Sequence, residues 1–168
     1  NAEQIMIRTT LIALLFAGLN FNSLPAEAIT RQNMLSLIRQ AGVTVSRRPT
    51  CGSNGRAAAH YEPGNNAICI AESQYRDTRY WDQALTHEAM HMVQDCMAGL
   101  HNSSLMTLAH NVSYKREVVA YIRQRGSNWV SFIKRHYRPA DYAIELEAYA
   151  LQDRPTDVAR LIQQKCVG

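Results

Sequence analysis

The sequence predicts one α+β domain, mainly helical, in which a short sheet precedes a long central helix. About 140 of the 168 residues follow a hydrophobic N-terminal leader, which is enough chain for one core and too little for two. Apolar residues recur at helical spacing along most of that remaining chain. Two short runs, 43–45 and 67–70, are instead typical of strands.

The first helix is expected to follow Thr30, a good N-cap, and to run to about Ala41, where Gly42 closes it. Residues 49–66 are rich in glycine, asparagine and proline, so we expect a loop that forms a mobile wall of a cleft. The long central helix should end at Gly99. Further helices are expected at 112–125, 129–137, 139–152 and 155–165.

Residues 1–28 have the features of an export signal. Arg8 precedes an apolar run at 11–19, and Ala26-Glu27-Ala28 is an A-x-A cleavage site. The run is shorter than the roughly 20 apolar residues that span a bilayer. We therefore expect residues 29–168 to be the folded domain, secreted or otherwise exported to a periplasm, a lumen or the outside of the cell. A retained leader would instead anchor the protein to a membrane.

Four cysteines without a C-x-x-C pair fit export, because secreted domains are commonly held by disulfides. Three pairings are open. We favour Cys51 with Cys69, which joins the loop to the strand before the central helix, and Cys96 with Cys166, which ties the C-terminal helix to the end of that helix. Four reduced, buried cysteines are the alternative.

The charge argues against a nucleic-acid partner. The chain has 18 basic and 14 acidic residues, a formal net charge of +4. The basic residues are scattered and do not align into a stripe with aromatic residues.

His87-Glu88-Ala89-Met90-His91 is the motif that carries chemistry. Histidines at i and i+4 lie on one face of a helix and can hold one Zn²⁺. Glu88 would then be the general base that takes a proton from water whose pKa zinc lowers to roughly 7. The motif therefore predicts a zinc metallopeptidase that acts on a peptide or protein substrate. Two buried histidines with ordinary hydrogen bonds are the structural alternative.

A catalytic zinc needs a third protein ligand. The version of the motif with a third histidine is excluded, because Gln94 and Met97 stand where its glycine and histidine would be. The helix at 139–152 offers two carboxylates, Glu145 and Glu147, about 200° apart around the helix axis, so both cannot face the same metal. We favour Glu145 and keep Glu147 as the alternative.

The segment from Glu145 to Ala148, after a His-Glu-x-x-His helix, resembles the glutamate-ligand zincins, in which the first glutamate of such a segment is the third zinc ligand. Residues 61–70, 85–91 and Cys96 resemble more closely the mitochondrial inner-membrane metallopeptidases that process an ATP synthase subunit. That family also has a cysteine in the strand before the helix and another five residues after the second histidine. The resemblance covers about half of the chain.

The resemblance implies a zincin-like domain with His87, His91 and Glu145 as metal ligands and Glu88 as the catalytic glutamate. In zincins an edge strand before this helix binds the substrate backbone, so residues 65–71 are expected to be the substrate edge. The substrate and the assembly role of the mitochondrial family are not carried over.

Supporting residues can be named by type. Asp95, at i+4 from His91, and Tyr149, at i+4 from Glu145, are candidates to orient the ligands. The mechanism also needs a hydrogen-bond donor for the developing oxyanion. The candidates by residue type are His110, Tyr114, His136, Tyr137, Tyr142 and Tyr149.

Two functions remain open from the sequence. One is an exported zinc metalloendopeptidase. The other is a non-catalytic subunit that keeps a zincin fold as a binding module on a membrane-associated assembly. The presence of Glu88 favours the first, because a binding module needs metal ligands but no base.

Overall fold

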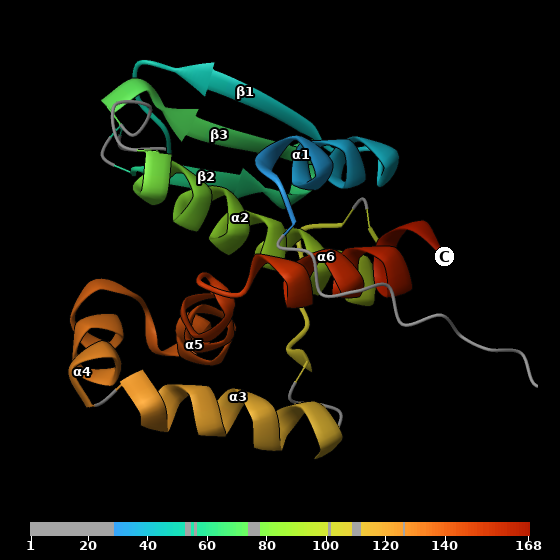
Figure 1. Ribbon diagram of the computed structural model, residues 1–168. Coiled ribbons are helices and arrows are strands. Elements are labelled where there is room, and N and C mark those ends of the chain that lie inside the picture. Colours follow the sequence, from blue (N-terminus) through green and yellow to red (C-terminus); the bar gives the residue numbers. More distant parts are fainter. Residues whose placement is uncertain are drawn as a thin grey trace, which may run out of the picture.

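The computed structural model describes residues 29–52, 55, 57–73, 78–100, 102–108, 112–125 and 127–168. The predicted leader at 1–28 lies outside these described residues. As Figure 1 shows, a small sheet lies on one side of a long helix, and a group of shorter helices lies on the other side. The prediction of a mainly helical α+β chain is confirmed.

The sheet has three strands, β1 (Thr44–Arg48), β2 (Ala59–Glu62) and β3 (Ala67–Ala71). Their order is β1-β3-β2, with β3 parallel to β1 and antiparallel to β2. The helix α1 (Arg31–Gln40) begins where Thr30 accepts a hydrogen bond from the Asn33 N–H, and Gly42 follows it with a φ of +80°. The predicted cap and stop of this helix are confirmed.

Two predictions about the sheet are wrong. Residues 49–66 are not one loop, because they contain β2 and a short 3-10 helix, η1 (Pro63–Asn65). Residues 65–71 do not form a substrate edge, because β3 pairs with a strand on both sides and its backbone is already used. The outer strand next to the central helix is β2, which is four residues long and buries only Tyr61 fully. A strand this short, with one buried side chain, lacks the alternation of apolar and polar residues by which a strand is recognised in a sequence.

The central helix is α2 (Thr78–Ala98), which ends at Gly99 with a φ of +97°. It packs against β2 and β3 on one side and against α5 (Tyr142–Leu151) and α6 (Pro155–Ile162) on the other. Every residue from Leu85 to Asp95 is buried as a result. A helix that is covered all round forms the middle of the core, as α2 does here.

The remaining helices follow the predicted order. The helices α3 (Val112–Arg125) and α4 (Ser127–His136) lie beside α5 in the helical group (Figure 1). The expected start at Pro139 is a 3-10 turn, η4 (Pro139–Asp141), which leads into α5. After α6 the chain continues as a π-helical turn, η5 (Gln163–Val167).

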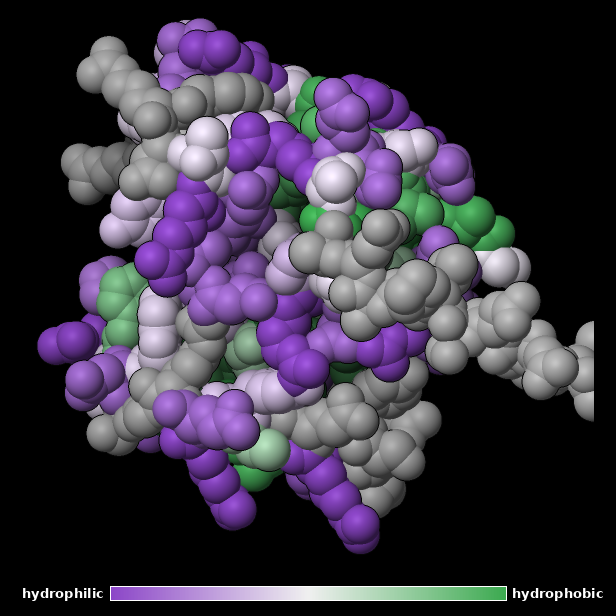
Figure 2. Space-filling view, in the orientation of Figure 1, coloured by the Kyte–Doolittle hydropathy of each residue, from purple (hydrophilic) through white to green (hydrophobic). Residues whose placement is uncertain are grey.

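Both favoured disulfides are confirmed. Cys51 pairs with Cys69 across 18 residues, and Cys96 pairs with Cys166 across 70 residues. Disulfides persist in oxidising compartments, so the two bonds indicate an exported protein. Among the described helices, none combines the length and the hydrophobicity needed to cross a bilayer. The face seen in Figure 2 is mostly hydrophilic, with hydrophobic residues showing in smaller separate areas.

Candidate metal centre

The buried stretch of α2 contains an unusual number of polar side chains. Burying a polar group without a partner costs about 1–3 kcal/mol in protein interiors, so each one needs a specific contact. Thr86 satisfies this need locally by donating to the Asp82 carbonyl at 2.8 Å. The others are directed toward neighbouring elements. They are His87, Glu88, His91, Gln94 and Asp95.

The structure brings His87, His91 and Glu145 together. The two histidines lie one turn apart on α2, and Glu145 comes from the first turn of α5, which packs beside it. The Nε2 atoms of His87 and His91 are 3.2 Å apart. Glu145 Oε2 lies 3.5 Å from His87 Nε2, and Glu145 Oε1 lies 3.6 Å from His91 Nε2. These three residues could hold a metal ion.

These separations match those of ligands around zinc. A tetrahedral Zn²⁺ with bonds of roughly 2.0–2.1 Å places its ligand atoms about 3.3 Å from one another. The observed distances of 3.2, 3.5 and 3.6 Å lie close to that value. In addition, the buried Oε2 atom of Glu145 has no hydrogen-bond partner among the described residues. Two neutral imidazoles and one carboxylate are a donor set that zinc accepts, so the residues fit the ion.

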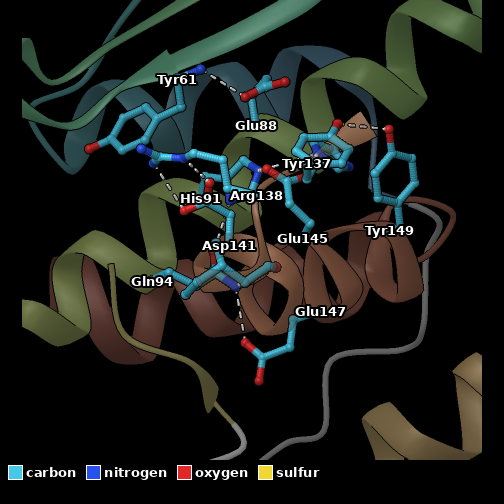
Figure 3. A network of polar contacts seen from close by, with 12 residues as sticks. Tyr61, Glu88, His91, Gln94, Tyr137, Arg138, Asp141, Glu145, Glu147 and Tyr149 are labelled. Carbon is cyan, nitrogen blue, oxygen red and sulfur yellow. Dashed lines mark hydrogen bonds and ion pairs between the residues drawn. The ribbon is translucent and has the colours of Figure 1, made fainter. Parts of the chain in front are cut away.

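Glu147 faces a different part of the core. Its Oε2 accepts hydrogen bonds from Gln94 Nε2 at 3.0 Å and from the Leu108 N–H at 2.9 Å (Figure 3). It is 1 % exposed, so it is not a surface glutamate, and it does not belong to the group of side chains that converge as candidate ligands. The rotation of about 200° between the two glutamates explains why only Glu145 reaches the histidines.

His91 is oriented by Gln94 and not by Asp95. His91 Nδ1 lies 2.8 Å from Gln94 Oε1, on the side of the ring away from Glu145. Asp95 instead accepts a hydrogen bond of 2.6 Å from the Tyr61 hydroxyl, because its side of α2 faces β2. Burial, with this contact to Asp95, raises the pKa of Tyr61. The expectation that Asp95 orients His91 is therefore wrong.

Glu88 is fixed by the outer strand of the sheet. Its Oε2 accepts a hydrogen bond of 2.7 Å from the backbone N–H of Tyr61 in β2 (Figure 3). Hydrogen bonds to an ionised acceptor are stronger than neutral ones, so this contact restricts the carboxylate firmly. Because that N–H points toward α2 and away from β3, the outer side of β2 faces the site.

The site is built to hold positive charge. Burial raises the pKa of Glu145, but the contacts with His87 and His91 outweigh burial and lower that pKa to about 2. Burial lowers the pKa of His91, but Glu145 and Glu88 outweigh it and raise that pKa to about 9. Without a metal ion, a proton on His91 therefore balances the carboxylates at neutral pH. A divalent cation would replace this proton, because a metal-binding imidazole must be neutral.

Two tyrosines border the site. The Tyr149 ring meets the His87 ring edge to face with centroids 4.5 Å apart, and the Tyr149 hydroxyl lies 3.0 Å from that of Tyr137. Burial and the nearby Glu145 charge raise the pKa of Tyr137, so its hydroxyl keeps its proton at neutral pH. The pair can therefore donate a hydrogen bond (Figure 3).

Two other oxyanion candidates, His136 and Tyr142, have backbone carbonyls as partners. His136 stacks on Phe132 and its Nδ1 lies 2.9 Å from the Phe132 carbonyl, while Tyr142 donates to the Lys134 carbonyl. His110 and the side chain of Tyr114 lie outside what the structure describes.

A family model described as a domain of unknown function (DUF8637) matches residues 27–167. No curated protein matches the chain, and no solved structure does.

Proposed function

The chain belongs to the DUF8637 family, and we propose that it is a zinc-dependent metalloendopeptidase with a zincin-like fold. One observation carries the proposal. Three candidate ligands from two helices converge at zinc-like separations, and the glutamate that follows the first ligand is buried and fixed by a strand beside them.

In this proposal His87, His91 and Glu145 hold the zinc. When bound, zinc supplies a Lewis acid that polarises the scissile carbonyl and lowers the pKa of the attacking water. Three protein ligands would leave the fourth position on a zinc ion open for that chemistry. An open position distinguishes catalytic zinc sites from structural ones, which have four protein ligands.

Glu88 is the general base. Its carboxylate accepts a proton from the attacking water and passes it to the amine of the leaving group. The Tyr61 N–H holds one oxygen of this carboxylate at 2.7 Å, so the base does not rotate out of position during turnover. The Tyr137–Tyr149 pair donates a hydroxyl hydrogen bond that stabilises the negative charge developing on the carbonyl oxygen.

The substrate is a peptide that lies beside β2. The Tyr61 N–H points out of the sheet toward Glu88, so a peptide along this side of β2 would pass the base. Extended peptides commonly bind by adding to the free edge of a sheet. With the two disulfides, this supports a protease that works in an oxidising, exported compartment.

Glu88→Gln tests the proposal. Glutamine has nearly the same shape and keeps an oxygen for the Tyr61 N–H, but it cannot take a proton. We expect bound zinc and melting temperature to be retained, while hydrolysis of an unfolded protein substrate falls by at least about 10²-fold. Glu72→Gln, at an exposed glutamate after β3, is the matched control and should leave hydrolysis unchanged.

Equal hydrolysis by wild type and Glu88→Gln would exclude Glu88 as the base. Stoichiometric zinc in the wild type without any hydrolysis would instead support the non-catalytic subunit. Zinc content is measured on the same samples, so the two outcomes are distinguished.

A further inference from the structure

A chain of buried polar groups leads away from His91 into the core. His91 Nδ1 lies 2.8 Å from Gln94 Oε1. Gln94 Nε2 donates to Glu147 Oε2 at 3.0 Å and to the Ile144 carbonyl at 3.1 Å. Gln94 is 0 % exposed and Glu147 is 1 % exposed. The catalytic proposal gives neither of them a role, although burying two such groups is costly.

The surroundings of Gln94 fix which way its amide points. The peptide carbonyl of Ile144 can only accept a hydrogen bond, and Glu147 Oε2 already accepts one from the Leu108 N–H. A flipped amide would set its oxygen against these two acceptors and lose both bonds. The NH₂ group therefore faces Glu147, and the oxygen faces His91.

An oxygen at that position decides the tautomer of His91. Gln94 Oε1 has no proton to give, so His91 Nδ1 must be the donor in the 2.8 Å contact. A neutral imidazole with a proton on Nδ1 has its lone pair on Nε2. That is the atom directed toward Glu145 and His87.

The two histidines are held by different means. His87 Nδ1 is buried and has no hydrogen-bond partner among the described residues, and its ring lies against Tyr149. Packing can fix the plane of a ring, but it does not choose which nitrogen carries the proton. Among the described residues, the tautomer is therefore specified at His91 and not at His87.

The same contacts join the two helices that supply the ligands. Gln94 lies on α2, and both Glu147 and Ile144 lie on α5, the helix of Glu145. The segment before residue 109 adds a further tie, because the Met106 N–H donates to the Gln94 carbonyl at 3.0 Å. The spacing between His91 and Glu145 thus depends on bonds made by Gln94.

We propose that Gln94 and Glu147 are positioning residues that hold His91 as the Nδ1–H tautomer, with Nε2 turned to the metal, and thereby set the affinity of the site for zinc. This inference rests on the proposed zinc site. It assigns to Glu147, the other glutamate of α5, a role that is separate from metal ligation.

Substitutions separate this role from simple packing. Gln94→Leu removes the acceptor for His91 Nδ1, and Glu147→Leu removes one of the two acceptors that hold the Gln94 amide in its orientation. We expect both to bind zinc about 10–100-fold more weakly, the usual effect of losing the partner of a ligand. Glu147→Gln can still accept from Gln94, so its zinc affinity should stay within about threefold of wild type.

Thr86→Val is the control for loss of stability. It removes another hydrogen bond of α2, the one that Thr86 donates to the Asp82 carbonyl, and leaves the contacts of His91 intact. It should lower the melting temperature without changing the zinc dissociation constant. Affinity is measured by competition with a chromogenic chelator, and the fold of each variant is checked by circular dichroism.

The histidine ring nitrogens give a readout that does not require any position 94 or 147 variant to fold. In zinc-loaded wild type, ¹H–¹⁵N correlation should show His91 with a slowly exchanging Nδ1–H and Nε2 bound to zinc. The His91 signals are assigned by through-bond correlation from the assigned backbone to the ring. A proton on Nε2, or zinc on Nδ1, would overturn the inference, as would unchanged zinc affinity in a folded Gln94→Leu. Failure of wild type to bind zinc at all would instead overturn the proposed function.

Discussion

The Cys96–Cys166 bond should stabilise the domain more than the Cys51–Cys69 bond. Cys96–Cys166 closes a loop of 70 residues that includes α3, α4, α5 and α6. Cys51–Cys69 closes a loop of only 18 residues around β2. Cross-linking a longer loop removes more freedom from the unfolded chain.

Chain entropy gives the size of the difference. For loops of 70 and 18 residues it predicts about 4.4 and about 3.2 kcal/mol at 25 °C, a difference of about 1.2 kcal/mol. The larger contribution to stability should therefore come from Cys96–Cys166.

The assay uses two variants that each keep one disulfide, Cys51→Ala/Cys69→Ala and Cys96→Ala/Cys166→Ala. Urea unfolding of each variant is followed with and without a phosphine reductant, in the presence of a chelator. The difference between oxidised and reduced protein isolates the remaining bond, because any cavity left by the alanines is present in both states. An equal or larger contribution from Cys51–Cys69 would refute the argument.

Three further predictions concern the site. In metal-free protein the pKa of His91 is raised to about 9, so its contribution to stability is complete below about pH 6.5 and lost as pH rises through 9. Melting temperatures with chelator should fall over this range, and a flat profile would contradict the His91–Glu145 contact. Glu145→Ala should abolish stoichiometric zinc binding, whereas Glu72→Ala should keep it, as dialysis and metal analysis would show. Tyr137→Phe should lower kcat by about 10²-fold with zinc retained. Tyr142→Phe, whose hydroxyl contacts Lys134, should change neither, and a normal kcat in Tyr137→Phe would remove that residue from the mechanism.

Sequence signals were sufficient wherever the structure is local. The Thr30 cap with Gly42, the stop of α2 at Gly99 and the bounds of α3 each depend on a few adjacent residues. The spacing of His87 and His91 is also local, because one helical turn places them on the same face. The rotation between Glu145 and Glu147 limited the third ligand to one of the two in the same way.

The strand β2 could not be predicted from the residues within it. Its four residues follow a stretch rich in glycine and polar residues, and it gains its identity by pairing with β3. The apolar run at residues 67–70 favours β3 as the substrate edge. A fully paired central strand is also apolar, because both of its faces are buried, so the run does not identify an edge strand.

By itself, the sequence determined the helices, the zinc-type motif and the short list of carboxylates that could complete it. The tertiary structure decided among neighbours that helical spacing cannot separate. Gln94 and Asp95 lie at i+3 and i+4 from His91, and either could have reached it. Only the packing of α2 between β2 and α5 turns Asp95 toward Tyr61 and Gln94 toward Glu147. Periodicity fixes directions within one helix, whereas the partner met in each direction depends on chain segments far away in sequence.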